Sequence, residues 1–442
     1  MSTCTRCGKE FTTTAGLKKH GQRKIPCGAI AEHVVEHVVE HVVAEPTLPT
    51  QFRENSKQFN QSTTKELRQE HGIFFTPPAA RARLFHVLHE LGVTPRTILE
   101  PSFGSGEFLL DAHLHYPHAR LLGVEQNETL FQSVACENSE LTCGDFLEWK
   151  GSADVILGNP PYFIMKYDHL SSKEKKEVAQ RHSVSMTGRL NIYVMFLYKC
   201  LVEHLEQDGF LAFILPTSLY NCSYYQPMRN YIAENTTVQH LETLDKPGFF
   251  ETGQDTMLLV IQKKKIHDNY IYRSANGTIY LSPYYTELRE MMAHSTTLTS
   301  LGLGAKTGNI VWNQVKDNLS DEGTLLIYST NINGSTLTLH NLRANKKQYV
   351  TGITKPALSG PVILVDRGYG NSLRFNAVRV ELPSFYAENH INVIYAKTPE
   401  AEPHLARVLA SFHDKRTALF LQWFIGNGAV SASDLEHNLP IF

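Results

Sequence analysis

Residues 97–110 read TILEPSFGSGEFLL, a short apolar run followed by a glycine-rich turn. Thr97-Ile98-Leu99 is typical of a buried strand, and a helix is expected to open at Phe108. The glycines between them let the backbone approach a ligand at the carboxyl end of the strand, where open α/β sheets bind their ligands. The turn does not match Gly-x-Gly-x-x-Gly, so by itself it indicates a nucleotide site only weakly.

The same order of strand and polar turn returns three times downstream. The three segments are Ala119–Val124 followed by Glu125, a third segment ending in Cys143-Gly144-Asp145-Phe146, and Ala153–Leu157 followed by Gly158-Asn159-Pro160-Pro161-Tyr162. An acid at Glu125 is placed to accept both hydroxyls of a ribose, and Asp145 suits an exocyclic amine. Because each turn follows a strand, all of them are expected to meet at one edge of one sheet.

Elements on either side complete an α/β pattern. Thr76-Pro77-Pro78 precedes a helical stretch from Ala79 to Leu91, and Gly209–Leu215 and Thr256–Ile261 predict two further buried strands. The alternation of strands and helices predicts a sheet with helices on both faces.

These motifs together resemble the S-adenosylmethionine-dependent amino-methyltransferases of DNA. Their order resembles the gamma-type adenine-N6 methyltransferases of restriction–modification systems, in which target recognition lies at the C-terminus. The resemblance covers roughly residues 70–262. Shorter matches, Thr307-Gly308-Asn309 to Asn313-Gln314 and Gly426-Asn427 to Pro440-Ile441, resemble their recognition domains.

The resemblance implies a Rossmann-like methyltransferase sheet and a set of site residues. It implies cofactor-binding roles for Thr76, Glu100, Ser102, Gly104, Gly106, Glu125, Asp145, Phe146, Asn159 and Pro161. It implies catalytic roles for Asn159, Pro160, Tyr162 and Phe250, the last as an aromatic ring that stacks on a flipped base. For Phe250 the neighbour Phe249 is an alternative, as is an ordinary core position.

The chemistry of adenine explains Asn-Pro-Pro-Tyr. The exocyclic amine is a poor nucleophile because its lone pair is delocalised into the ring. The Asn159 side-chain oxygen and the Pro160 carbonyl can each accept one N–H and so direct the lone pair at the methyl group. Tyr162 offers a face for a flipped base. The alternative, a simple tight turn, is disfavoured by the cofactor motifs upstream.

Direct displacement needs no cysteine, so Cys136, Cys143, Cys200 and Cys222 are interpreted as buried structural thiols.

The first thirty residues carry the spacing of a zinc finger. Cys4, Cys7, His20 and Cys27 follow the order of a ββα finger, with Phe11 and Leu17 as a miniature core. The last ligand departs from the usual pattern, being Cys rather than His, and a chance arrangement is the alternative. Residues 32–43 then repeat Glu-His-Val-Val three times, which is interpreted as a linker rather than a metal site.

Four regions are therefore expected. They are a zinc finger at 1–30, a linker at 31–69, a methyltransferase domain at 70–265 and an α+β target-recognition domain at 266–442. Trp312, Arg367, Tyr369 and Arg374 of the last region are candidates for contact with DNA.

Composition is consistent with a DNA enzyme only after the charge is divided. The formal net charge is −2 over 442 residues, which taken as a whole argues against nucleic acid. However, residues 1–30 hold six bases and one acid and residues 263–442 hold 18 bases and 14 acids, whereas residues 46–262 hold 18 bases and 25 acids. No apolar run suits a membrane span, and the seven cysteines favour a reducing intracellular compartment, cytoplasmic or nuclear.

The leading hypothesis is methyl transfer to adenine N6 in a specific double-stranded DNA sequence, with S-adenosylmethionine and zinc as cofactors. Other planar amines (cytosine N4, RNA adenine or protein glutamine) and a non-catalytic DNA-binding module are the alternatives. Asn rather than Ser at position 159 favours adenine. No nuclease motif is evident, so a monomeric modification enzyme, with a separate cognate endonuclease possible, is expected.

Overall fold

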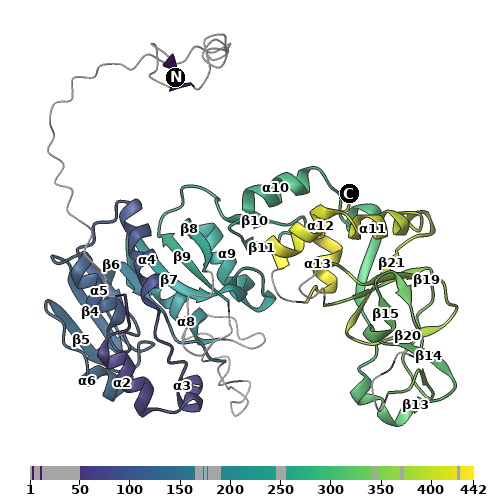
Figure 1. Cartoon of the computed structure of the whole chain (residues 1–442), viewed down its shortest axis with the longest axis horizontal. Coiled ribbons are helices and arrows are strands. Elements are labelled where there is room, and N and C mark those ends of the chain that lie inside the picture. The colour runs from purple at the N-terminus through teal and green to yellow at the C-terminus, as the bar shows by residue number, and fades with distance from the viewer. Residues whose placement is uncertain are drawn as a thin grey trace. The chain divides into compact units, whose positions relative to one another are not determined.

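The computed structural model describes residues 2–3, 10–11, 50–164, 173, 177, 191–244, 255–340, 342, 346–368, 373–425 and 429–442 (Figure 1). The chain divides into two compact units, Met1–Pro46 and Thr47–Phe442. In the first unit, β1 (Ser2–Thr3) pairs antiparallel with β2 (Glu10–Phe11). The expected zinc ligands Cys4, Cys7, His20 and Cys27 lie outside the described residues.

A seven-stranded sheet organises the part of the second unit in which catalysis is expected, residues 50–262, hereafter the catalytic half. Its strands are β3 (Thr97–Glu100), β4 (Arg120–Glu125), β5 (Ser139–Cys143), β6 (Ala153–Gly158), β7 (Leu205–Pro216), β8 (Thr237–Leu244) and β9 (Thr256–Gln262). Their order is β5-β4-β3-β6-β7-β9-β8, and β9 runs antiparallel to both of its neighbours. The expected α/β sheet is therefore present, and its strand bounds agree with the predicted ones to within a few residues.

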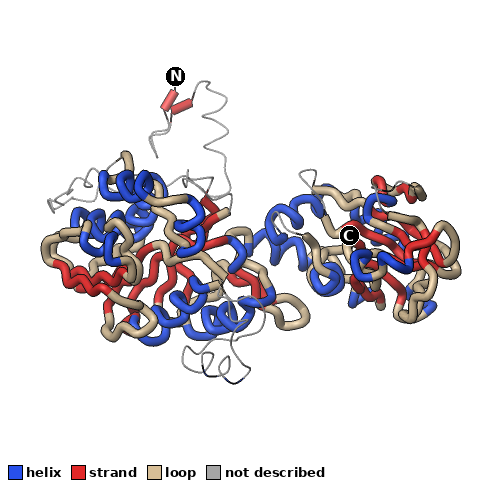
Figure 2. The backbone as a smooth tube through the Cα atoms, turned by 90° about the horizontal axis from the view of Figure 1, so that it is seen from below, coloured by secondary structure: helices blue, strands red, loops and turns tan. Residues whose placement is uncertain are grey.

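Apolar side chains alternate between the two faces of this sheet. In β3, Ile98 packs into one core and Leu99 into the other, because successive side chains of a strand point to opposite faces. The helices on the two sides are α4 (Pro78–Glu90) and α5 (Glu107–His115) against the core that holds Ile98, and α8 (Ile192–Lys199) and α9 (Gln226–Asn235) against the other. Figure 2 shows helices on both sides of the strands, as expected for a sheet that is buried on both faces.

Two helices begin in the segment expected as a linker, 31–69, and the second of them extends past its end. They are α2 (Glu54–Ser62) and α3 (Lys65–His71). Phe59 of α2 is 8% exposed and its ring lies edge-on to Phe75, with centroids 5.9 Å apart. Helix α2 therefore packs on the catalytic half. The short helix α6 (Glu128–Gln132) follows β4.

The C-terminal half contains two four-stranded sheets. One has the order β12-β21-β18-β19 and the other β13-β17-β14-β20. The strands are β12 (Leu303–Thr307), β13 (Leu319–Ser320), β14 (Thr324–Ile327), β17 (Tyr349–Val350), β18 (Val362–Asp366), β19 (Ala377–Val380), β20 (Phe385–Ala387) and β21 (Ile391–Ala396). The remaining elements are the hairpin β15 (Ile332–Asn333) and β16 (Thr336–Leu337), with α10 (Tyr285–Ala293), α11 (His404–Phe412), α12 (Lys415–Phe420) and α13 (Ala432–His437). The C-terminal half therefore contains both strands and helices.

A hairpin between the two halves contributes to both hydrophobic cores. Its strands are β10 (Ile271–Arg273) and β11 (Ile279–Leu281), which pair antiparallel. Ile271, Ile279 and Leu281 pack in the core of the catalytic half, whereas Tyr272 and Tyr280 pack in the C-terminal core. The alternation of a strand thus places one face of the hairpin in each core.

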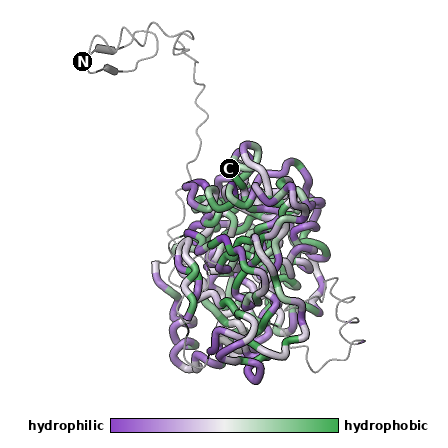
Figure 3. The backbone as a smooth tube through the Cα atoms, turned by 90° about the vertical axis from the view of Figure 1, so that its right-hand side faces the viewer, coloured by the Kyte–Doolittle hydropathy of each residue, from purple (hydrophilic) through white to green (hydrophobic). Residues whose placement is uncertain are grey.

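Hydrophobic segments concentrate inside the described chain and hydrophilic ones at its periphery (Figure 3). No helix among the described residues is both long and apolar enough to cross a membrane. The expectation of buried cysteines holds for Cys200 and is wrong for Cys143, which is exposed because β5 is an edge strand. Cys136 and Cys222 are only partly buried.

Candidate active site

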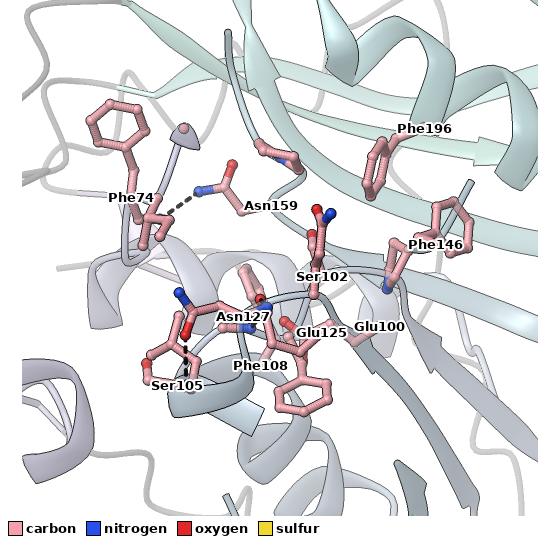
Figure 4. Close-up of a pocket in the computed structure, with 18 of the residues that line it drawn as sticks. Phe74, Glu100, Ser102, Ser105, Phe108, Glu125, Asn127, Phe146, Asn159 and Phe196 are labelled. Carbon is pink, nitrogen blue, oxygen red and sulfur yellow. Dashed lines mark hydrogen bonds between the residues drawn. The ribbon is translucent and has the colours of Figure 1, made fainter. Parts of the chain in front are cut away.

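A cavity of about 350 Å³ lies at the carboxyl ends of β3, β4, β5 and β6 (Figure 4). This volume is within the range of sites for small molecules and cofactors. Among the predicted site residues, its lining contains Thr76, Glu100, Ser102, Gly104, Glu125, Asp145, Phe146, Asn159 and Pro161. Gly106, Pro160 and Tyr162 do not line it, and Phe250 lies outside the described residues.

The turn after β3 depends on glycine at two positions. Gly104 and Gly106 have φ of 55° and 78°, a left-handed conformation that side chains disfavour. A Cβ at Gly106 would also meet Val134 Cγ1 at 2.8 Å. Gly106 therefore shapes the entry to α5 without lining the cavity.

Glu125 is held at the end of β4 by two backbone amides. Gly104 N–H donates to one carboxylate oxygen at 2.8 Å and Asn127 N–H donates to the other at 2.7 Å. Burial raises the pKa of Glu125, and these amide bonds oppose the rise. Each oxygen keeps a further lone pair, so the carboxylate can accept hydroxyl groups of a ligand.

Glu100 and Ser102 carry polar atoms that lack partners within the described chain. Glu100 is 2% exposed and its Oε2 atom has no hydrogen bond, nor does the buried hydroxyl of Ser102. Burial raises the pKa of Glu100 well above its ordinary value. Because buried polar groups are normally hydrogen-bonded, these two atoms are suited to bind polar groups of a ligand in the cavity.

Asp145 and Phe146 follow β5 and differ in exposure. Asp145 is exposed, and one of its carboxylate oxygens accepts the backbone N–H of Leu147 at 2.8 Å. Phe146 is 2% exposed and its ring packs 4.9 Å from that of Phe196, which also lines the cavity. This end of the cavity therefore combines an aromatic wall with an acid at its rim.

Asn159, immediately after β6, is anchored through its side-chain amide. Its Nδ2 donates to the Thr76 hydroxyl at 3.0 Å and to the Phe74 carbonyl at 3.3 Å, and Figure 4 shows it turned toward this segment. Its Oδ1 accepts from the Tyr162 hydroxyl. The oxygen retains one lone pair for a further donor.

Tyr162 is more buried than its predicted role as a stacking face suggests. It is 8% exposed, and its ring is 6.5 Å from Phe74 and 6.0 Å, edge-on, from Tyr193. Its hydroxyl also lies 2.6 Å from the Ile214 carbonyl. Burial raises its pKa well above the ordinary value, so the hydroxyl remains a donor.

A buried ionic network below the cavity was not predicted from the sequence. Arg81 of α4 is fully buried and pairs with Asp111 at 2.7 Å and Glu107 at 2.8 Å, both on α5. Arg53 pairs with the same two acids, and the Ser56 hydroxyl bonds to Glu107 and to Ser105 of the glycine turn. The signal for Arg81 was its spacing from Leu84 and Leu88, which placed a charge on the apolar face of the helix.

The predicted DNA-contact residues of the C-terminal half differ in their surroundings. Trp312 is half-buried, with the ammonium groups of Lys316 and Lys346 5.2 and 4.9 Å from its ring. The buried Nε of Arg367 has no hydrogen bond, Arg374 is exposed, and Tyr369 lies outside the described residues. No group of three or more potential metal ligands occurs among the residues that the structure describes.

Known proteins resemble this chain over most of its length. Residues 111–250 match the Eco57I restriction-modification methylase family. The chain is 30% identical to the modification methylase CviBIII of Paramecium bursaria Chlorella virus NC1A, over 89% of this chain and 99% of that protein. It is 27% identical to the Type II methyltransferase M.CvrRI of Paramecium bursaria Chlorella virus XZ-6E, over 88% and 99% respectively. Among solved structures, the type I restriction-modification methyltransferase subunit from Streptococcus thermophilus has a TM-score of 0.37 and 20% identity, covering 48% of this chain and 51% of that chain.

Proposed function

Because the chain belongs to the Eco57I-type restriction–modification methylases and methylates DNA with S-adenosylmethionine, we propose that its acceptor is the N6 amine of adenine. The adenine would lie within a specific double-stranded sequence and be flipped out of the helix. The observation that carries the proposal is the Asn159 amide, whose nitrogen is bound by Thr76 and Phe74 while its oxygen keeps a free lone pair. An acceptor of N–H bonds is what a planar amine requires.

The residues around the cavity fit S-adenosylmethionine. The open oxygen of Glu100 would accept an ammonium group, and the free lone pairs of Glu125 would accept a ribose diol. Asp145 and the aromatic wall at Phe146 suit an adenine ring. When bound, the cofactor supplies an electrophilic methyl group.

The chain itself orients the amine. Asn159 Oδ1 and the Pro160 carbonyl would each accept one N–H of the acceptor, which favours a pyramidal nitrogen with its lone pair directed at the methyl group. The acceptor nitrogen would take the methyl group as its bond to the sulfonium sulfur breaks, which leaves a neutral thioether, and the nitrogen would lose one proton to solvent. Tyr162 and Phe250 are proposed to hold the two faces of the base, which for Tyr162 requires its ring to become more exposed than it is here.

The remaining regions are assigned by the same proposal. Residues 266–442 would recognise the target, and Cys4, Cys7, His20 and Cys27 would bind one zinc ion. The enzyme would act as a monomer in a reducing compartment, with any cognate endonuclease encoded separately. Metal analysis of the purified full chain tests the zinc site, since zinc content should fall when Cys4 and Cys7 are both replaced by Ser.

The acceptor is tested by product analysis. The full chain is incubated with methyl-labelled S-adenosylmethionine and long duplex DNA of mixed sequence, and the DNA is digested to nucleosides. We expect N6-methyladenine; N4-methylcytosine as the sole product would contradict the adenine assignment.

The role of Asn159 is tested by replacing it. Asn159→Ala should lower the methylation rate by roughly 100- to 1,000-fold, as losing one transition-state hydrogen bond does elsewhere, while cofactor affinity is kept. Asn235→Ala, at the exposed last residue of α9, is the matched control and should leave the rate unchanged. Equal loss of cofactor binding and transfer would show that Asn159 has another role.

A further inference from the structure

The orientation of the Asn159 amide determines whether it can serve a planar amine. A carboxamide presents either an acceptor oxygen or a donor NH2 group, and only the oxygen can bind an N–H of the acceptor. The Phe74 carbonyl, 3.3 Å from Asn159 Nδ2, cannot donate, so the end of the amide that faces it must be the NH2 group. The opposite end, which accepts from Tyr162, is then the oxygen.

Thr76 accepts the second N–H. Its hydroxyl lies 3.0 Å from Asn159 Nδ2 and the residue is 3% exposed, so water does not replace this bond easily. With both N–H groups bound, rotation of the amide by 180° would leave two N–H bonds unmade and place two oxygens in contact. Breaking such buried bonds costs on the order of tenfold in an equilibrium for each one.

The backbone of Thr76 is itself held by Arg81. Its carbonyl accepts from Arg81 Nη1 at 2.6 Å, and Arg81 is held by Asp111 and Glu107. Thr76 thus links the ionic network below the cavity to the side chain of Asn159.

We propose that Thr76 is a positioning residue for methyl transfer: its hydroxyl, with the Phe74 carbonyl, holds Asn159 so that its oxygen faces the acceptor amine. This inference rests on the proposed role of Asn159. It differs from the cofactor-binding role that the sequence resemblance implies for Thr76.

The test replaces the hydroxyl while keeping the shape. Thr76→Val removes one acceptor and leaves the amide held by the Phe74 carbonyl alone, so kcat should fall by up to roughly tenfold at saturating cofactor and DNA. Thr76→Ser keeps the hydroxyl and should restore most of the rate. Thr94→Val, at an exposed position, is the matched control and should behave as the wild type.

Two further measurements separate positioning from other roles. The dissociation constant for S-adenosylmethionine should be unchanged in Thr76→Val, and adding Thr76→Val to Asn159→Ala should cause no further loss, because Thr76 acts through Asn159. Weaker cofactor binding with unchanged kcat, failure of Thr76→Ser to restore the rate, or additive losses would each overturn the proposal.

The product of the wild-type reaction separates failure of the proposed acceptor from failure of the proposed role of Thr76. If wild-type protein methylates cytosine rather than adenine, the proposed acceptor fails, but the Thr76 measurements still apply to that reaction. If wild type methylates adenine and Thr76→Val matches it in rate, only the positioning role fails. Thermal unfolding of each variant identifies any loss of rate that comes from misfolding.

Discussion

Arg81 and Arg229 are both fully buried, yet their charges are compensated differently in two regions of the molecule. Arg81, close to the glycine turn that follows β3, pairs with the carboxylates of Asp111 and Glu107. Arg229, on α9 beside the β10–β11 hairpin, forms no ion pair with a described carboxylate. Its guanidinium instead donates to the carbonyls of Ile279, Leu219 and Cys222 and to the Gln226 side chain.

The two arrangements should respond differently to damage. A buried charge paired with specific charges leaves those partners uncompensated when it is removed. A charge held by carbonyl dipoles leaves only neutral acceptors behind, and its own desolvation is relieved at the same time. Consistent with this, burial lowers the pKa of Arg229 to about 10. The region around Arg81 should therefore lose more stability than the region around Arg229 when its arginine is replaced.

The largest effect is expected from Arg81→Met. It leaves Asp111 and Glu107 with only Arg53 as a partner and frees the carbonyl of Thr76, so the free energy of unfolding should fall by about 3–5 kcal/mol. Chemical denaturation measures this loss. A loss below about 1 kcal/mol would show that Arg53 alone can compensate both acids.

The matched control for this variant is on the same helix. Arg83 is 35% exposed and pairs with Glu242 at 2.8 Å, so Arg83→Met should cost less than about 1 kcal/mol. If Arg81→Met and Arg83→Met lower the free energy of unfolding equally, burial does not make the Arg81 ion pairs more important than the Arg83 pair.

Arg229→Met is expected to have a smaller effect than Arg81→Met. It removes the donor for several buried carbonyls but also a buried charge, so a loss of about 1–3 kcal/mol is expected. The same denaturation experiment compares the two directly. If Arg229→Met lowers the free energy of unfolding more than Arg81→Met does, the expected order of the two regions is wrong.

The last prediction concerns pH and Glu100, a buried acid with no basic side chain of the described residues within ion-pair distance. Its raised pKa means that the native protein binds this proton more tightly than the unfolded chain does. The cofactor-free protein should thus gain stability from Glu100 as pH falls through that pKa, and lose it as pH rises. Affinity for the cationic cofactor should change in the opposite direction, by up to about tenfold per pH unit below the pKa.

The dissociation constant for S-adenosylmethionine, measured between about pH 5 and pH 8, gives this dependence. Glu100→Gln should bind more weakly at the upper end and lose the part of the pH slope that Glu100 causes. An identical slope in Glu100→Gln would assign the dependence to another group, such as Glu125.

The catalytic half could be predicted well because its motifs are contiguous. Glu100, Glu125, Asp145 and Asn159 each follow a strand directly, so locating the strands was enough to expect them at one edge of the sheet. The structure brings all four to one cavity. Their individual roles remain predictions.

Contacts between distant segments could not be predicted in this way. Arg53 and Asp111 are 58 positions apart and meet only because α2 folds back onto α5. The burial of Tyr162 likewise depends on Phe74 and Tyr193, which lie on other elements. In the C-terminal half, the parallel pairing of β14 with β20 carries no local signal in the sequence.

The β10–β11 hairpin has a consequence for exchanging recognition regions between relatives. Since Tyr272 and Tyr280 pack on Phe424 while Ile271 and Leu281 pack in the catalytic core, the hairpin must match both parents of a chimaera. A junction on either side of it would pair one of its faces with a foreign core. A chimaera that exchanges the C-terminal half therefore needs one face of the hairpin to be redesigned for the new core. Inserting one residue into either strand would turn the side chains after the insertion to the opposite face.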